Sequence, residues 1–134
     1  MSKIIDVEGI GPVYAEKLQL IGVETTKDLL EKCGSRSGRQ DAAEKTGISE
    51  KLILEWVNLA DLFRIKGVGE EYSDLLEESG VDTVAELAQR NPENLYNKML
   101  QVNEEKSLVR RTPWLSSVKS WVEQAKTLPR KVEY

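Results

Sequence analysis

The sequence predicts an all-α fold, and three observations lead to this prediction. Apolar residues recur at helical spacing along the 134 residues, and no segment shows the alternation or the β-branched enrichment of a strand. Prolines and glycines stand where helices would begin and end. Residues 4–30 and 62–88 align without a gap at a constant offset of 58, so one helical arrangement is used twice. The residues that match are Gly9, Gly11, Tyr14, Leu18, Gly22, Val23, Thr25 and Leu29 in the first copy and Gly67, Gly69, Tyr72, Leu76, Gly80, Val81, Thr83 and Leu87 in the second.

In the first copy, Pro12 stands at the start of a helix, where its fixed φ is favourable and its missing N–H costs nothing. Gly22 ends this helix in a left-handed conformation, and Thr25 or Thr26 caps the next helix. The second copy follows the same order, so we expect equivalent helices over about 70–79 and 83–90.

Further helices follow each copy. Residues 34–38 are rich in Gly and Ser and predict a polar loop, followed by a short helix over 41–46. Gly47 predicts a break, and a longer helix starts near Ser49.

In the second half, Asn91 and Pro92 open one helix and Pro113 opens the last. The duplication predicts a division into residues 1–61 and residues 62–134, each a repeat with its following helices. We expect these two parts to share one globular unit.

Three tryptophans lie at helical spacing in these later helices. Such residues are core residues far more often than ligand contacts, so we expect Trp56, Trp114 and Trp121 to be buried. Trp56 and Trp114 also differ by 58, which pairs them in the repeat.

Composition excludes several classes of protein. No apolar run approaches the roughly 20 residues that span a bilayer, and the N-terminus lacks the regions of a signal peptide, so we expect a soluble protein of the cytoplasm without a membrane partner. Cys33 is the only cysteine and histidine is absent, which excludes an intramolecular disulfide and leaves no recognisable zinc site. We therefore expect no metal and no cofactor, and we interpret Cys33 as a small, partly buried apolar residue.

Charge is distributed unevenly along the chain. The net charge is −4, but residues 1–105 carry 12 Lys and Arg against 21 Asp and Glu, whereas residues 106–134 carry 7 against 2. This basic end is either a solvated helix face or a binding patch. It contains Lys106, Arg110, Arg111, Lys119, Lys126, Arg130 and Lys131.

Each copy contains a Gly-apolar-Gly turn that precedes an amphipathic helix. Two glycines around one buried apolar residue allow a sharp turn at φ angles that other residues avoid. The first N–H groups of the following helix then point outward without partners, with the positive end of the helix dipole behind them, and this favours an anion. The two turns consist of Gly9, Ile10 and Gly11 and of Gly67, Val68 and Gly69.

These residues resemble the helix-hairpin-helix family, whose pattern is an apolar approach, a Gly-apolar-Gly hairpin, a helix and a Gly-apolar-x-Thr continuation. The resemblance implies tandem helix-hairpin-helix repeats, each followed by additional helices in one compact helical domain. In that superfamily, paired hairpins commonly bind the phosphates of duplex nucleic acid through backbone amides, which here implies contacts at both turns. The wider layout, closest over residues 65–121, also resembles an uncharacterised bacterial family of tandem helix-hairpin-helix domains known only as a domain of unknown function.

The chain departs from the family just after each turn. DNA-binding members usually carry Lys, Arg, Ser or Thr there, whereas this chain has Pro12 and Val13 in one copy and Glu70 and Glu71 in the other. The two carboxylates oppose a phosphate, although they also stabilise the helix dipole. We therefore expect weak, salt-dependent contact with nucleic acid. The side chains expected to assist it are Lys66, Arg110, Arg111 and Lys119.

An enzyme is not expected, because the chain has no histidine, no recognisable nucleophile and base, and no Walker or dinucleotide signature. Two functions remain open. The first is a nucleic-acid-binding module. The second is a protein-interaction adaptor that has lost its phosphate site and uses its acidic body, its basic C-terminal helix and the apolar pair Leu20 and Ile21.

Overall fold

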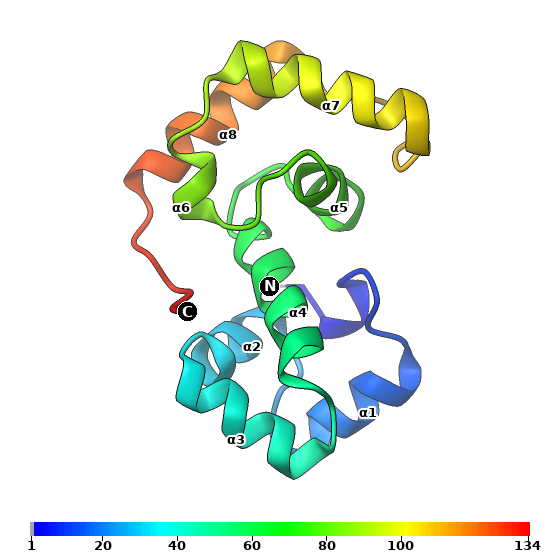
Figure 1. Ribbon diagram of the computed structural model, residues 1–134, viewed down its shortest axis with the longest axis vertical. Coiled ribbons are helices and arrows are strands. Elements are labelled where there is room, and N and C mark those ends of the chain that lie inside the picture. The colour runs from blue at the N-terminus through cyan, green and yellow to red at the C-terminus, as the bar shows by residue number, and fades with distance from the viewer. Residues whose placement is uncertain (1) are drawn as a thin grey trace. The chain divides into compact units, whose positions relative to one another are not determined.

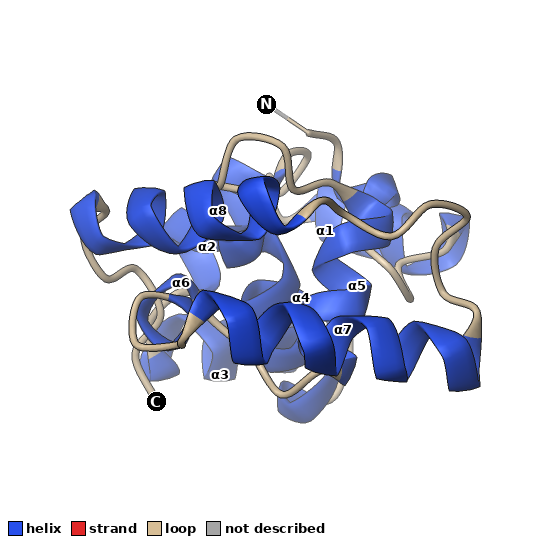
Figure 2. Ribbon diagram, turned by 90° about the horizontal axis from the view of Figure 1, so that it is seen from above, coloured by secondary structure: helices blue, strands red, loops and turns tan. Residues whose placement is uncertain are grey.

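A computed structural model describes residues 2–134 and confirms the all-α prediction (Figure 1). Figure 2 shows helices joined by loops, and the described residues include no strand beyond one isolated bridge between Lys3 and Thr25. None of the described helices is both long enough and apolar enough to cross a membrane. In chain order the elements are η1 (Ile4–Asp6), α1 (Pro12–Leu20), α2 (Thr26–Cys33), α3 (Arg36–Thr46), α4 (Glu50–Leu62), α5 (Glu70–Glu78), α6 (Val84–Leu87), α7 (Pro92–Lys106) and α8 (Leu115–Thr127).

The chain forms two compact units. The first unit contains residues 2–61 together with Arg130–Tyr134, and the second contains Leu62–Pro129. Helices α1 to α4 and helices α5 to α8 therefore give the two units the same order of elements. The division differs from the predicted one in the last five residues, which return to the first unit.

Hydrogen bonds and burial explain this return. The guanidinium group of Arg39 donates to the carbonyl of Glu133, and the Glu133 N–H donates to the carbonyl of Gly34. Val132 between them is 2% exposed. A sequence pattern could not predict this docking, because it joins positions 94 residues apart.

Capping contacts fix the helices of the first copy, as predicted. Gly22 follows α1 with a φ of +84°, which an L-residue with a side chain rarely adopts. Thr25 and Asp28 form a capping box at the start of α2, each side chain accepting a hydrogen bond from the backbone N–H of the other. Lys32 then donates to the carbonyl of Ile21, which ties α2 to the end of α1.

The second copy has equivalent contacts. Thr83 accepts a hydrogen bond from the Glu86 N–H, and the Glu86 carboxylate accepts one from the N–H of Asp82. Arg90, the counterpart of Lys32, donates to the carbonyl of Gly80, one residue after the counterpart of Ile21. The duplication therefore preserves the hydrogen bonds that hold each helix pair, and not only its glycines.

The second capped helix is shorter than predicted. The sequence predicted helix over about 83–90, but α6 has only 4 residues. The N–H of Arg90 donates to the carbonyl of Leu87 three residues earlier, which tightens the chain, and Asn91 then caps α7. A residue before proline avoids the helical conformation, so the chain turns out of the helix before Pro92.

The predicted polar loop over 34–38 is wrong, because α3 already begins at Arg36. Ser35 caps it by accepting a hydrogen bond from the Gly38 N–H. A Cβ atom on Gly34 would lie 2.5 Å from the carbonyl oxygens of Leu30 and Lys131, so this glycine serves close packing. Gly and Ser here mark a helix start and a tight approach rather than a loop.

The prediction for the last helix is also wrong at its start. Helix α8 begins at Leu115, and Trp114 precedes it as an N-cap residue that is 72% exposed. The buried counterpart of Trp56 is Trp121, since each is the seventh residue of its helix. The pairing of Trp56 with Trp114 by their offset is therefore incorrect.

Each of the two buried tryptophans packs beneath a turn. A Cβ atom on Gly9, where φ is +91°, would lie 3.2 Å from Nε1 of Trp56. A Cβ atom on Gly67, where φ is +98°, would lie 3.1 Å from Nε1 of Trp121. Tyr14 and Tyr72 cover the indoles, with ring centroids 5.0 and 5.3 Å from Trp56 and Trp121 respectively. One glycine, one tyrosine and one tryptophan thus form the same cluster in each unit.

We predict that Gly9→Val lowers the free energy of unfolding by about 2–3 kcal/mol, because it places a β-branched residue in a left-handed conformation against Trp56. Gly11→Val is the matched control. Gly11 has a φ of −85° and open space around its Cβ position, so this change should cost at most about 1 kcal/mol. Urea unfolding followed by tryptophan fluorescence measures both, and equal losses would contradict the steric account of the turn.

Cys33 is fully buried rather than partly buried, and burial raises the pKa of its thiol to about 11 from an ordinary 9.0. We predict that iodoacetamide fails to alkylate the native protein at pH 8.5 and reacts once urea unfolds it.

Because folding disfavours the thiolate, the contribution of the Cys33 thiol to the free energy of unfolding is complete below pH 9 and is lost as the pH rises towards 11. In urea unfolding, Cys33→Ala should lose less stability than the wild type between pH 9 and 11. An equal loss in both proteins would contradict the assignment of this pH dependence to the Cys33 thiol.

Candidate functional site

The two turns have the same backbone geometry. Gly9 and Gly67 both have a positive φ, and the apolar residue that follows each points inward, Ile10 with 4% and Val68 with 5% of its surface exposed. The N–H of Ile10 donates to the carbonyl of the residue three positions earlier, and so does that of Val68. Each turn is thus held by an anchor residue inside and a glycine against an indole.

The second glycine of each turn has a different status. Gly11 and Gly69 have φ values of −85° and −117°, which any residue adopts, and a Cβ atom on either would meet nothing within 4 Å. Neither conformation nor packing within the described residues therefore requires glycine at these positions. A glycine here leaves the space above the helix start open.

No side chain caps α1 or α5. The N-cap residues Gly11 and Gly69 have no side chain that accepts a hydrogen bond, unlike Thr25 and Thr83 at the starts of α2 and α6. The N–H groups in the first turns of α1 and α5 consequently have no intrahelical acceptor and no capping side chain, and α1 has one N–H fewer because its first residue is Pro12. Both helices present partial positive charge at the turn.

The side chains just beyond the turns differ in charge. The first turn of α1 carries no acidic residue, and Val13 there is 67% exposed. The first turn of α5 carries Glu70 and Glu71, both exposed. Their carboxylates oppose an anion at the second turn, and the exposed carboxylate of Glu8, directly before Gly9, opposes one at the first turn.

Lys66 lies directly before the second turn, and its backbone is fixed. Its N–H donates to Oε1 of Gln124 at 2.9 Å, and Nε2 of Gln124 donates back to the Lys66 carbonyl at 3.2 Å. Gln124 lies one turn after Trp121 on α8, so one helix supports both the turn and its basic neighbour. The Lys66 side chain is exposed beside the turn.

Arg111 is another predicted basic residue whose backbone is tied to the cluster of the second turn. Its carbonyl accepts a hydrogen bond from the Tyr72 hydroxyl at 2.9 Å, and Tyr72 packs on the Trp121 indole beneath the turn. Arg110 and Arg111 are both exposed. The segment after α7 is therefore tied to the second turn, although the sequence offered no reason for this proximity beyond its charge.

Lys119 is placed away from the turn. Two helical residues turn the chain by about 200°, so Lys119 and Trp121 point to nearly opposite sides of α8. Lys119 also forms an ion pair with Glu93 at 3.5 Å. Its predicted partnership with the hairpin has no geometric support.

Other lysines of the basic end are also neutralised. Lys106 forms an ion pair with Glu78, which raises its pKa, and Lys126 pairs with Glu123 at 3.1 Å. The basic end is thus not one continuous patch of unpaired cations.

The carboxyl group of Asp28 has a shifted pKa, and the shift has a structural cause. The pKa of Asp28 is lowered, chiefly because its carboxylate accepts a hydrogen bond from the Glu24 N–H and others at the capping box. Among the described residues no group of three or more His, Cys, Asp or Glu could hold a metal ion.

Sequence reasoning missed three features of this region. Trp121 was not assigned to the second turn, because it follows Trp56 by 65 residues rather than 58. Gln124 carried no signal, since a single glutamine on a helix face is ordinary. The sequence paired Leu20 with Ile21, but Ile21 is half-buried, and the exposed partner of Leu20 is Val13, two helical turns earlier on α1. Val13 and Leu20 are 67% and 83% exposed, a pattern that their counterparts, Glu71 and Glu78, could have indicated.

The comparison with known proteins yields one family. No curated protein and no solved structure matches the chain significantly. One family model matches residues 8–128, which include both turns and all eight α-helices. The chain therefore belongs to the family described as domain of unknown function DUF4332.

Proposed function

We propose that this protein is a non-enzymatic module of the cytoplasm that binds the nucleic-acid backbone, without reading sequence, through the N–H groups at its two turns. The observation that carries the proposal is the pair Gly11 and Gly69. Each copy has a glycine at this position, yet neither the φ of these two residues nor the atoms around them require glycine. A requirement for close approach by a phosphate explains a glycine at that place.

Rigidity of the turn supports this role. Trp56 and Trp121 pack against the first glycine of each turn, so the N–H groups of α1 and α5 keep one orientation. Preorganised donors lose little entropy when an anion binds. Backbone N–H groups contact phosphate oxygens without distinguishing bases, which gives affinity independent of sequence.

Charge acts differently on the two turns in this proposal. The first turn of α1 has no acidic residue, but Glu8 is exposed directly before Gly9. Glu70 and Glu71 stand beside the second turn, where Lys66 and the segment of Arg111 offset part of their repulsion. Carboxylates therefore weaken the contact at both turns, and in the described part of the chain only the second turn has basic residues beside it.

A specific observation favours a second candidate, a protein-interaction adaptor. Val13 and Leu20 form an exposed apolar pair on α1, while the equivalent residues of α5 are Glu71 and Glu78. An apolar pair kept on one copy and replaced by charge on the other is typical of a contact surface. In this candidate α1 meets a partner protein through its outer face.

We predict that the double variant Gly11→Val and Gly69→Val loses most of its affinity for nucleic acid. The valine side chains fit the fold, because each Cβ position is open, but they occupy the space in front of the N–H groups. Fluorescence anisotropy of labelled duplex DNA, single-stranded DNA and structured RNA at about 50 and 200 mM salt measures the change. Wild-type binding should weaken at the higher salt.

Two controls make this test decisive. Gln19→Val on the exposed side of α1 adds the same side chain away from the turn and should bind as the wild type does. Glu70→Gln with Glu71→Gln should bind more tightly, because it removes two negative charges beside the second turn. Unchanged affinity of the glycine double variant, with its fold intact by circular dichroism, would refute the proposal.

For the adaptor, we predict that Val13→Glu with Leu20→Glu, which installs the residues of the second copy, abolishes capture of a partner protein from extracts of the native host. Both side chains are exposed, so the variant should unfold at the same urea concentration as the wild type. Gln19→Glu adds a negative charge to an exposed position of α1 outside the face that Val13 and Leu20 share, and serves as a charge control. A partner protein captured equally by the wild type, the double variant and the charge control would contradict the assignment of this face of α1 to partner binding.

A further inference from the structure

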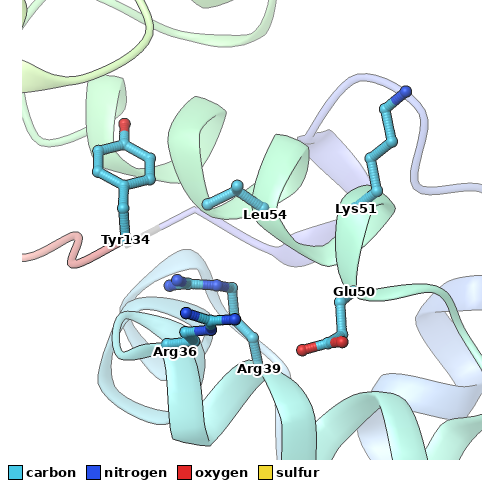
Figure 3. A pocket seen from close by; sticks show the side chains of 6 residues that line it. All are labelled: Arg36, Arg39, Glu50, Lys51, Leu54 and Tyr134. Atoms are coloured by element: carbon cyan, nitrogen blue, oxygen red, sulfur yellow. The ribbon is translucent and has the colours of Figure 1, made fainter.

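The first unit contains a pocket that is separate from its turn. It has a volume of about 290 Å³ and lies between α3, the first half of α4 and the C-terminal segment (Figure 3). A pocket of this size accommodates a small organic molecule. Its lining residues are Arg36, Arg39, Glu50, Lys51, Leu54 and Tyr134.

Arg39 is the anchor of this pocket. Its side chain is 4% exposed, and its guanidinium group donates to the carbonyls of Cys33, Gly34 and Glu133. A guanidinium group has five N–H donors, so one on Nε and one on Nη2 have no partner among the described residues. The three carbonyls fix the group in place, and none of the acidic side chains in the described part of the chain forms an ion pair with it.

The neighbouring cations are also unpaired. Arg36, Arg39 and Lys51 form no ion pair within the part of the chain that the structure describes. Lys45, on the same helix as the two arginines, pairs with Asp41 at 3.0 Å. Unpaired cations gathered in one pocket favour an anion there.

The position of the arginines strengthens this preference. Arg36 is the first residue of α3, whose first turn holds no acidic residue, and Arg39 follows one turn later. The helix dipole repels cations at a helix N-terminus. An anion bound between the two arginines is attracted both by them and by the dipole. Figure 3 shows the two guanidinium groups next to each other, whereas the amino group of Lys51 extends away from them.

The remaining walls have a different character. Leu54 and the ring of Tyr134 lie on the other side of the pocket from the two guanidinium groups (Figure 3). Leu54 offers an apolar surface to a ligand, and the ring of Tyr134, whose centroid lies 5.9 Å from Cζ of Arg130, offers a planar one. Glu50 places a carboxylate at one side, which excludes a ligand whose negative charge fills the whole pocket.

We propose that this pocket binds a phosphate monoester of a small apolar or aromatic group. Arg36 and the two spare donors of Arg39 hold the phosphate, and Leu54 with Tyr134 contacts the organic part. A phosphate offers three acceptor oxygens to two planar guanidinium groups, whereas a carboxylate offers two oxygens and saturates one group. This site is independent of the two turns, so it does not depend on the function proposed above.

The test is isothermal titration calorimetry of the full chain with phenyl phosphate, inorganic phosphate, benzoate and phenol. We expect saturable binding of phenyl phosphate at one site, weaker binding of inorganic phosphate and benzoate, and none of phenol. Arg36→Gln should lower the affinity for phenyl phosphate about tenfold, as expected for loss of a charge-assisted hydrogen bond. Lys51→Gln should cause a smaller loss, because its amino group points away.

Matched variants separate the pocket from general charge effects. Lys45→Gln removes one positive charge from the same helix outside the pocket and should leave the affinity unchanged. Glu50→Gln should raise the affinity about threefold, because it removes the one acidic side chain among the lining residues. Gln19→Val, which changes an exposed residue of α1 outside the pocket, should bind phenyl phosphate as the wild type does.

Four results would overturn the proposal. Absence of phenyl phosphate binding would refute the site, and equal losses in Arg36→Gln and Lys45→Gln would assign the binding to net charge. Benzoate bound as tightly as phenyl phosphate would refute the preference for phosphate. Inorganic phosphate bound as tightly would refute the organic part of the ligand.

Discussion

The packing of a tryptophan indole beneath a left-handed glycine is the contact on which each unit depends. Gly9 and Gly67 can hold their positive φ and admit the indole only because they lack a Cβ atom. The indole comes from the last helix of its unit and the glycine from the turn before the first, so this contact joins the two ends of each four-helix set. Tyr14 and Tyr72 cover the same indoles and extend the cluster to the first helix.

The duplication separates what the fold needs from what is free to vary. The caps, the tyrosines and the basic residues that tie each helix pair, Lys32 and Arg90, occur in both units at the same offset. Outside this framework the units diverge. Val13 and Leu20 stand where the second unit has Glu71 and Glu78, so one skeleton carries an apolar face in one unit and an acidic face in the other. Any function must come from these outer differences or from the N–H groups that both turns share.

Charge in this protein is organised by contacts rather than by position along the chain. The basic end looks like one patch in the sequence, but Lys106, Lys119 and Lys126 each pair with a glutamate. The cations that have no such partner include Arg36 and Arg39, which lie in a segment of balanced charge. The local composition of the sequence therefore does not predict where cations without an ion-pair partner lie. A Coulomb interaction depends on distances, and folding sets these distances.

The sequence by itself determined the all-α class, the helix starts at Pro12 and Pro92, the left-handed glycines and the duplication, because these depend on backbone preferences within a few neighbouring residues. It also located the two turns. Only the tertiary structure decided that Trp121 rather than Trp114 is the partner of the second turn, and that the last five residues pack in the first unit. It likewise decided that Arg39 is buried among carbonyls. These outcomes join residues far apart in the chain, and their energies come from packing and desolvation, which no local pattern encodes.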